Sequence, residues 1–436
     1  MNSLMTTFLS ILLLLATFNF AHLEAQNLSD TEKKIVELID KDQAHSLALL
    51  EKVVNINSGT MNFEGVKEVG MVLEKEFEAI GFDTKWIDGK AFDRSGHLLA
   101  SYGNKGKKLL LIGHLDTVFA KDSPFQSFKV IDKHSIAGPG ITDMKGGDIV
   151  MISALKALKQ TGVLDNLQIR VVITGDEEKR GKPMDLANKA LIDAGKWANV
   201  ALGFEDGDGD PKTAVVSRRG STGWQLEVKG RPAHSSQIFR EDYGDGAIFE
   251  TARILNQFRE KLSSETNLTF NPGVILGGTD VEFDSGLGKG TSFGKTNVIA
   301  QSTVVAGDIR AISPQQLVKA QSMMNDIVSQ NLNKTSASLN FFPGYPPMAP
   351  SEGNKRLLEI YNQASQSLGF GSVAAVDPRK AGAADISFVA NYVDMALDGL
   401  GLMGKGGHTV TEVADIRTLA SQTKRAAILI YQLSKT

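Results

Sequence analysis

The chain has 436 residues, which is enough for two domains with sizeable hydrophobic cores. Charged residues make up 22% of it, and the net charge of -3 comes without a basic block, which argues against nucleic-acid binding. The sequence contains no cysteine, so a disulfide scaffold, a thiol nucleophile and Cys-ligated zinc are excluded, and any bound metal must use His, Asp or Glu.

The N-terminal segment has features of a secretory signal peptide. An apolar run from Phe8 to Phe18 is too short to span a membrane, and the small residues Ala21 and Ala25 follow it as cleavage positions. We expect a signal peptide over residues 1–25, export to the periplasm or the medium, and no stable membrane association after cleavage. The alternative is an uncleaved anchor, because no Lys or Arg precedes the apolar run.

The next part of the chain alternates between helical and strand patterns. The predicted elements are helices from about Asp30 and over 62–80, a strand over 108–112, a helix over 148–160, and strands over 167–174 and 200–204. Such an alternation is typical of an α/β layer structure.

The pattern changes near Ser217. The following predicted elements are a strand over 222–228, a helix over 246–262, strand material over 296–311, a helix over 313–331 and a strand over 336–342. This order suits a small α+β domain. The proline-rich segment 343–347 reads as a linker, and a helix over 354–368 resumes the first pattern. We therefore predict one α/β domain, residues 26–217 and 346–436, interrupted by an inserted domain over 218–345.

Acidic and imidazole side chains follow several of the predicted strands. His114 and Asp116 come after a buried run, and their spacing points both to the same face of a strand. One can bind a metal while the other supports it. Asp143 follows a glycine-rich loop and suits a carboxylate that bridges two metals. Glu177 and Glu178 are adjacent, so one can bind a metal while the other transfers protons.

Two further residues complete this set. Glu205 ends a predicted strand, and His408 lies in the flexible segment Gly-Lys-Gly-Gly-His-Thr. Taken alone, most of these residues are more easily explained as polar surface or loop residues, and Asp143 could equally be a turn or helix-cap residue. The acidic segment GFEDGDGD could instead be a surface loop or a calcium-type loop. Their joint occurrence in this order predicts a two-metal hydrolase site at one edge of a sheet.

Six motifs carry a family resemblance. GHLDTVF, GPGITDMKGG, TGDEEKRG, GFED, GRPAHSS and GGHTVTE resemble the motifs of the di-zinc metallopeptidases that include glutamate carboxypeptidase, aminoacylase, succinyl-diaminopimelate desuccinylase and peptidase T. The resemblance spans about Asp30 to Thr436. It implies a mixed-sheet α/β catalytic domain of the zinc-exopeptidase type, with an inserted α+β, ferredoxin-like domain that serves as a lid and for homodimerisation.

The resemblance also implies roles for single residues. It implies zinc ligands at His114, Asp143, Glu178, Glu205 and His408, with Asp143 bridging two zinc ions that cobalt or manganese could replace. It further implies that Glu177 is the general base, that Asp116 orients His114, and that the peptide bond between Asp143 and Met144 is cis.

In the inserted domain, the resemblance implies that His234 stabilises the transition-state oxyanion in the partner subunit. It implies that Arg310 holds a substrate carboxylate and that Asn297 contacts the substrate or the oxyanion. Without the family, His234 would be read as a turn histidine and Arg310 as an edge-strand charge.

These observations predict an exported zinc exopeptidase or amidohydrolase that cleaves an amide next to an amino acid with a free carboxylate, in the manner of a glutamate carboxypeptidase. Its substrate would be a small peptide or an N-acyl amino acid. One alternative is an N-acyl amino-acid deacylase, which uses the same site. Another is a non-catalytic metal- or peptide-binding protein, and a third is a domain stabilised by calcium in the acidic loop.

Overall fold

The computed structural model describes residues 28–435, so the predicted signal peptide lies outside the described residues. The chain forms two compact units. The first contains the described residues of Met1–Ala214 together with Gly353–Ala375 and Asp394–Thr436, and the second contains Val215–Glu352 and Val376–Val393. Across the described part of the chain, no helix combines the length and the apolar character that crossing a membrane requires.

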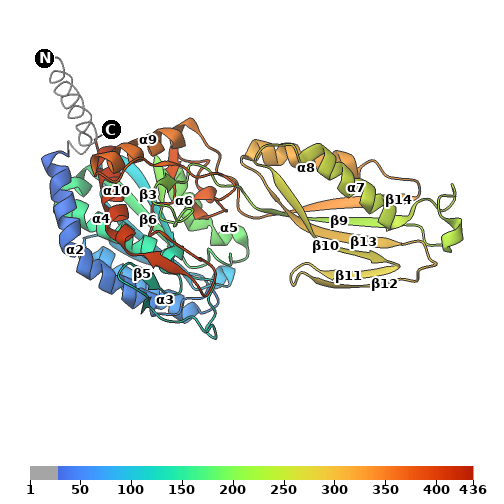
Figure 1. The fold of residues 1–436 in the computed structure, drawn as a ribbon, viewed down its shortest axis with the longest axis horizontal. Coiled ribbons are helices and arrows are strands. Elements are labelled where there is room, and N and C mark those ends of the chain that lie inside the picture. Colours follow the sequence, from blue (N-terminus) through green and yellow to red (C-terminus); the bar gives the residue numbers. More distant parts are fainter. Residues whose placement is uncertain (1–27, 436) are drawn as a thin grey trace, which may run out of the picture. The chain divides into compact units, whose positions relative to one another are not determined.

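The first unit is built on a six-stranded mixed sheet (Figure 1). Its spatial order is β1 (Asp83–Asp88), β2 (Gly96–Tyr102), β6 (Leu167–Thr174), β3 (Lys107–His114), β7 (Val200–Gly203) and β16 (Met395–Leu397). β6, β3, β7 and β16 run parallel to one another, whereas β2 pairs antiparallel with both β6 and β1. The strongly apolar runs of β3 and β7 fit this central position, because parallel strands are covered on both faces.

Helices cover both faces of this sheet. α4 (Gly146–Gln160) lies against the face that carries Gly113, while Trp197 at the end of α6 (Lys189–Trp197) stacks with Lys108 and Arg170 on the other face. The remaining helices of this unit are α2 (Asp30–Val54), α3 (Phe63–Ala79), α5 (Met184–Ala187), α9 (Glu352–Ser367) and α10 (Arg417–Leu433), with α2 and α10 packed on α4.

The two glycines that begin α4 explain how the loop before this helix reaches the sheet edge. A Cβ atom at Gly147 would lie 1.8 Å from the carbonyl oxygen of Phe204, and one at Gly146 would lie 2.5 Å from the Leu402 side chain. Only glycine therefore permits this approach. The approach brings Asp143, just before the helix, to the carboxyl ends of β3 and β7.

Short strands complete the first unit around this edge. β5 (Ser135–Ala137) lies between β4 (Lys129–Val130) and β18 (Val413–Asp415), and β17 (Gly404–Lys405) pairs with β18. β8 (Thr213–Ala214) pairs in parallel with β15 (Ala374–Ala375). The pairing of β17 and β18 closes the loop that carries His408.

The second unit has the ferredoxin-like order of elements (Figure 1). Its sheet has the order β10 (Thr269–Gly278), β13 (Ser302–Arg310), β9 (Thr222–Gly230) and β14 (Thr335–Pro343), all antiparallel. α7 (Gly246–Leu262) and α8 (Pro314–Val328) pack on this sheet around a core that includes Trp224 and Phe258. Ser313 caps α8 by accepting from the N–H of Gln316.

The predicted fold class is confirmed, whereas several elements differ from their prediction. The sequence did not predict β10, nor the hairpin of β11 (Asp280–Asp284) and β12 (Lys289–Phe293). β10 contains Pro272 and three glycines, which weaken the strand signal and are tolerated because β10 is an edge strand. The segment Val376–Val393, assigned by the sequence to the first domain, belongs to the second unit.

Candidate functional site

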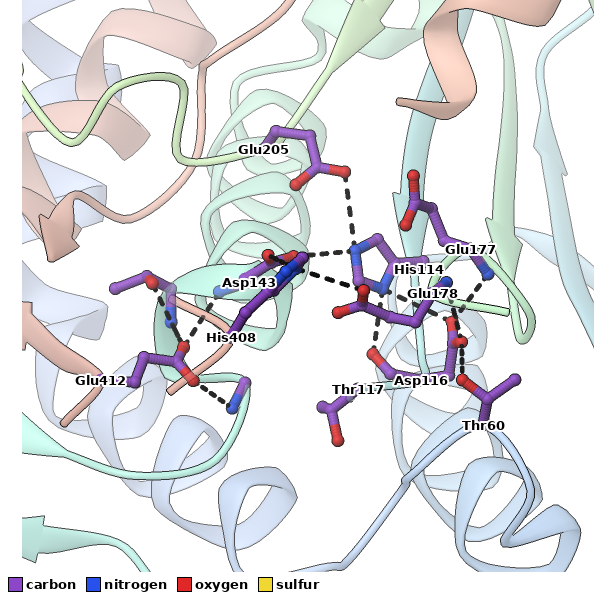
Figure 2. A network of polar contacts seen from close by, with 12 residues as sticks. Thr60, His114, Asp116, Thr117, Asp143, Glu177, Glu178, Glu205, His408 and Glu412 are labelled. Atoms are coloured by element: carbon purple, nitrogen blue, oxygen red, sulfur yellow. Dashed lines mark hydrogen bonds and ion pairs between the residues drawn. The ribbon is translucent and has the colours of Figure 1, made fainter. Parts of the chain in front are cut away.

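β3 ends at His114, and a single hydrogen bond sets the direction of this imidazole. The ring is 1% exposed, and Nδ1 donates to the main-chain oxygen of Asp116 at 3.0 Å. Nε2 therefore faces the carboxylates of Asp143, at 3.1 Å, and Glu205, at 3.5 Å (Figure 2). A carbonyl acceptor that fixes the tautomer in this way is characteristic of histidines that bind metals.

Asp116 connects this strand end with the turn that follows β6. Its fully buried carboxylate accepts from the N–H groups of Glu177, at 3.0 Å, and Glu178, at 3.1 Å, and from the hydroxyl of Thr60 at 2.6 Å. Burial raises the pKa of Asp116, but the hydrogen bond and the charge of His114, with smaller contributions from the Thr60 hydroxyl and the Arg180 charge, hold it below its usual value. Asp116 thus positions the backbone of both glutamates.

Asp143 lies between the two histidines. One carboxylate oxygen faces His114, and the other lies 2.8 Å from Nε2 of His408. Each histidine has a glutamate beside it, because Glu205 lies 3.5 Å from His114 and Glu178 lies 3.2 Å from His408. The cluster therefore consists of two His–Glu pairs that share one aspartate (Figure 2). The peptide bond between Asp143 and Met144 is cis, as predicted.

The two adjacent glutamates point in different directions. The carboxylate of Glu178 turns toward His408, and its second oxygen, Oε1, is buried without a hydrogen-bond partner among the described residues. The carboxylate of Glu177 lies on the side of Glu205, and its charge helps to raise the pKa of that residue (Figure 2). This divergence agrees with the predicted division between a metal ligand and a proton-transferring group.

The charges of the cluster shift its pKa values strongly. Hydrogen bonds with Asp143 and Glu178 raise the pKa of His408 to about 11. Burial opposes a charged His114, but Glu205 and the two aspartates raise its pKa well above the usual value. Burial also raises the pKa of Glu178. The pKa of Glu205 is raised well above its usual value by burial, and the negative charge of Asp143 adds to this effect. The two histidines and the acids of the cluster thus shift one another's pKa values strongly.

The donor set fits divalent cations. It offers imidazole nitrogens and carboxylate oxygens, and the ligand atoms of His114, Asp143 and Glu178 lie within 4.8 Å of one another. The orphaned Oε1 of Glu178 is the kind of buried acceptor that a cation would satisfy. One cation would be held by His114 and Glu205, another by Glu178 and His408, with Asp143 shared.

Glu412 is a site residue that the sequence reasoning did not identify. Its buried carboxylate accepts from the N–H groups of Gly140, at 2.9 Å, Thr142, at 2.8 Å, and Asp143, at 3.2 Å, and from the Thr142 hydroxyl. Burial raises the pKa of Glu412 to about 7 against the effect of these donors. A glutamate four residues after His408 was the available signal, but only the fold shows what it contacts.

We predict that Glu412→Ala weakens metal binding. Loss of this acceptor leaves several buried N–H groups unpaired, at a cost of about 1–3 kcal/mol each, and releases the turn before Asp143. Metal affinity, measured by competition with a chromophoric chelator, should fall at least roughly tenfold, since 1.4 kcal/mol is a factor of ten. Glu412→Gln keeps one acceptor oxygen and should restore part of the affinity. Wild-type affinity in Glu412→Ala would contradict this role.

The three predicted residues of the inserted domain lie in the second unit. His234 is exposed, and its Nδ1 accepts from the N–H of Ser236 at 3.3 Å, so a neutral ring carries its proton on Nε2. Asn297 lies beside it, because its main-chain oxygen accepts from Ser235 at 2.9 Å. Arg310 is bonded to Asp308 at 2.7 Å. Their roles stay predictions.

The acidic loop after β7 is organised by its own chain. The Asp208 carboxylate accepts from the Thr213 hydroxyl at 2.6 Å, and Asp210 accepts from the N–H of Lys212 at 2.9 Å. Within residues 28–435, the side chains that lie close enough together to hold a metal ion are those around Asp143, and none of them belongs to this loop. The observed geometry gives the calcium-type alternative no support.

Comparisons with known proteins agree with this geometry. The model of peptidase family M20/M25/M40 matches residues 110–432. Carboxypeptidase G2 of Pseudomonas sp. (strain RS-16) is 27% identical over 404 residues, covering 90% of each chain. A probable succinyl-diaminopimelate desuccinylase of Staphylococcus aureus (strain MRSA252) is 26% identical over 307 residues, covering 65% of this chain and 72% of the relative.

The fold also has close structural counterparts. The crystal structure of aminopeptidase PepT from Bacillus cereus ATCC 10987 superposes with a TM-score of 0.70 at 19% identity. The match covers 90% of this chain and 98% of that one. At this identity the likeness establishes the fold alone.

Proposed function

Because the chain belongs to peptidase family M20/M25/M40, we propose that it hydrolyses an amide bond next to an amino acid with a free carboxylate. The family predicted from the motifs is thereby confirmed, and the chain is a hydrolase. The proposal rests on the position of Asp143 between two histidines. Each of its carboxylate oxygens faces one histidine, and each histidine has a glutamate beside it. A non-catalytic binding protein would not need Glu177 beside this cluster.

The site residues have different roles in the proposed reaction. Bound divalent cations would polarise the amide carbonyl and make a water molecule more acidic. Glu177, whose backbone is fixed by Asp116, takes the proton of the attacking water and delivers it to the leaving nitrogen. The Nε2–H of His234 would donate to the oxyanion of the tetrahedral intermediate.

The proposed substrate is an amide with a carboxylate on the leaving amino acid. Arg310 would bind this carboxylate, since a guanidinium group can bond both of its oxygens, and Asn297 would contact the substrate or the oxyanion. The relative named carboxypeptidase supports an amino acid released from a C-terminus, and the relative named desuccinylase supports removal of an acyl group. N-acyl amino-acid deacylation is therefore the second candidate function.

Metal analysis combined with a substrate panel tests the proposal. We expect two divalent cations per chain, zinc in the native protein, and recovery of activity when zinc, cobalt or manganese is returned to chelated enzyme. We expect the panel of C-terminal dipeptides and N-acyl amino acids to contain cleaved substrates, and their amidated counterparts to be resistant. A metal content well below one ion per chain, together with no activity after zinc or cobalt is added, would contradict the proposed function.

We further propose that the protein is exported and acts as a homodimer. The apolar run from Phe8 to Phe18 supports export by cleavage after Ala25, and the family's inserted domain supports dimerisation. N-terminal sequencing of the protein from the producing cell should begin at Gln26. A mature chain that retains residues 1–25 would contradict cleavage and favour a membrane anchor.

A further inference from the structure

A pocket of about 550 Å³ opens beside the metal-site residue Glu178, within the first unit. This volume lies in the range of small-molecule sites. Its lining includes Met61, Val118 and Ala120 as apolar groups, and Lys121 and Lys179 as cations. Thr60 and Thr117 also line the pocket, and Figure 2 shows Thr60 beside the carboxylate of Asp116.

The pocket walls are two loops that are held together by their main chains. The N–H of Thr60 donates to the carbonyl of Thr117 at 3.1 Å, and the N–H of Thr117 donates to Ser58 at 2.9 Å. The amide of Asn57 donates to the carbonyl of Phe119 at 3.1 Å. These bonds fix the pocket before any ligand binds, which lowers the entropy cost of binding.

Glycine at position 59 is required for this contact between the loops. A Cβ atom there would lie 2.2 Å from the carbonyl oxygen of Phe119. The two walls therefore pack backbone against backbone beside the site. Side chains further along each loop, Met61 at 53% and Val118 at 40% exposure, are left to face a ligand.

The charges of the lining favour an anionic group at some distance from the metal cluster. Lys121 has only a weak ion pair with Glu64, at 3.7 Å between two exposed side chains. Asp122 is the acid of the lining that lies outside the metal cluster, because Glu178 is turned to His408. Outside the metal cluster the lining thus contributes two flexible ammonium groups and one carboxylate. Lysine suits a distal anion whose position varies, because its charge sits on a flexible stem.

We propose that this pocket binds the acyl side of the scissile amide and selects acyl groups whose apolar chain ends in a carboxylate. Met61 and Val118 would contact the methylene groups, and Lys121 and Lys179 would bind the terminal anion. The assignment rests on the proposed amide hydrolysis, since it names the part of the substrate that occupies this side of the site. The carboxylate on the leaving amino acid, close to the reacting nitrogen, is the one suited to arginine.

The test compares N-acetyl, N-hexanoyl and N-adipoyl derivatives of the amino acid that the substrate panel selects. Hexanoyl and adipoyl groups have the same length, and only adipoyl ends in a carboxylate. Wild-type kcat/KM should rise from acetyl to hexanoyl to adipoyl. Met61→Trp fills the pocket and should lower kcat/KM for both long groups by roughly 10- to 100-fold, the effect of losing a methylene-sized contact or more, and should lower it far less for acetyl, which has no chain to place in the pocket.

Matched variants separate the pocket from general effects. Met71→Trp places the same ring at a methionine of α3 that is 48% exposed and should change nothing. Met61→Ala removes the apolar contact without filling the pocket and should also reduce the preference for hexanoyl. Joint Lys121→Gln and Lys179→Gln replacement should reduce the advantage of adipoyl over hexanoyl by roughly fivefold, the scale of one exposed ion pair.

The outcomes distinguish this inference from the proposed function. If the wild-type enzyme cleaves no substrate of the panel, the proposed function fails and the pocket assignment fails with it. If the wild type cleaves them but Met61→Trp and Met61→Ala leave the acyl preference unchanged, the pocket assignment alone is overturned. A changed preference among leaving amino acids at constant acyl group would place the other half of the substrate there and would also overturn it.

Discussion

Glu177→Gln should keep both metal ions and lose turnover by roughly 10²–10⁴-fold, the contribution of general acid–base catalysis. The glutamine occupies nearly the same volume, and the N–H bond from residue 177 to Asp116 is unaffected by the change. The variant cannot accept a proton from water at this position. Metal content by elemental analysis and kcat on a cleaved substrate of the panel are the two measurements.

Glu178→Gln is the matched control, because it makes the same chemical change one residue later. Glu178 contacts His408 at 3.2 Å and has a second, unpartnered oxygen, so its neutralisation should weaken metal binding. Excess metal should then recover part of the activity of Glu178→Gln but none of that of Glu177→Gln. The assignment is wrong if Glu177→Gln loses metal while Glu178→Gln keeps both metal and rate.

His234→Ala should lower turnover strongly while leaving metal content and stability nearly unchanged. The side chain is exposed and its hydrogen bonds are with Ser236 of the same segment, so its removal should disturb neither the metal ligands nor the fold. If His234 acts on the site of a partner subunit, mixing His234→Ala chains with Glu177→Gln chains should restore part of the activity. Each mixed dimer would contain one site with both groups intact.

The mixing experiment requires that subunits exchange. Exchange can be shown with differently tagged chains that are purified in sequence through both tags. A mixture of His234→Ala chains with His234→Ala chains carrying the second tag is the control and should stay inactive. Demonstrated exchange without any return of activity would mean that His234 acts within its own chain or is merely structural.

Elements with a strong local signal were predictable. The apolar runs of β3 and β6 and the amphipathic pattern of α4 and α7 lie where they were expected, because the local period of apolar residues decides such elements. β10 and the hairpin β11–β12 were missed. Their sequences contain glycine, proline or charges at most exposed positions, and β10 is fixed by pairing with β13 rather than by its own propensity.

The types of the site residues were also predictable, since five of the six motifs contain every histidine and acid of the cluster. The contacts between them were not. The sequence alone did not predict that the Asp116 carboxylate accepts from the backbone of the two glutamates, while its carbonyl makes the shortest contact with His114. The structure also assigned Glu412 to the turn before Asp143.

The sequence by itself thus determined the hydrolase family, the absence of cysteine chemistry and the order of the donors along the chain. The tertiary structure alone decided which donors share Asp143, which unit contains 376–393, and that a pocket adjoins Glu178. The physical reason is sequence separation: His114 and His408 meet at one aspartate although 294 residues separate them by their numbers, and only sheet pairing and helix packing bring such segments together.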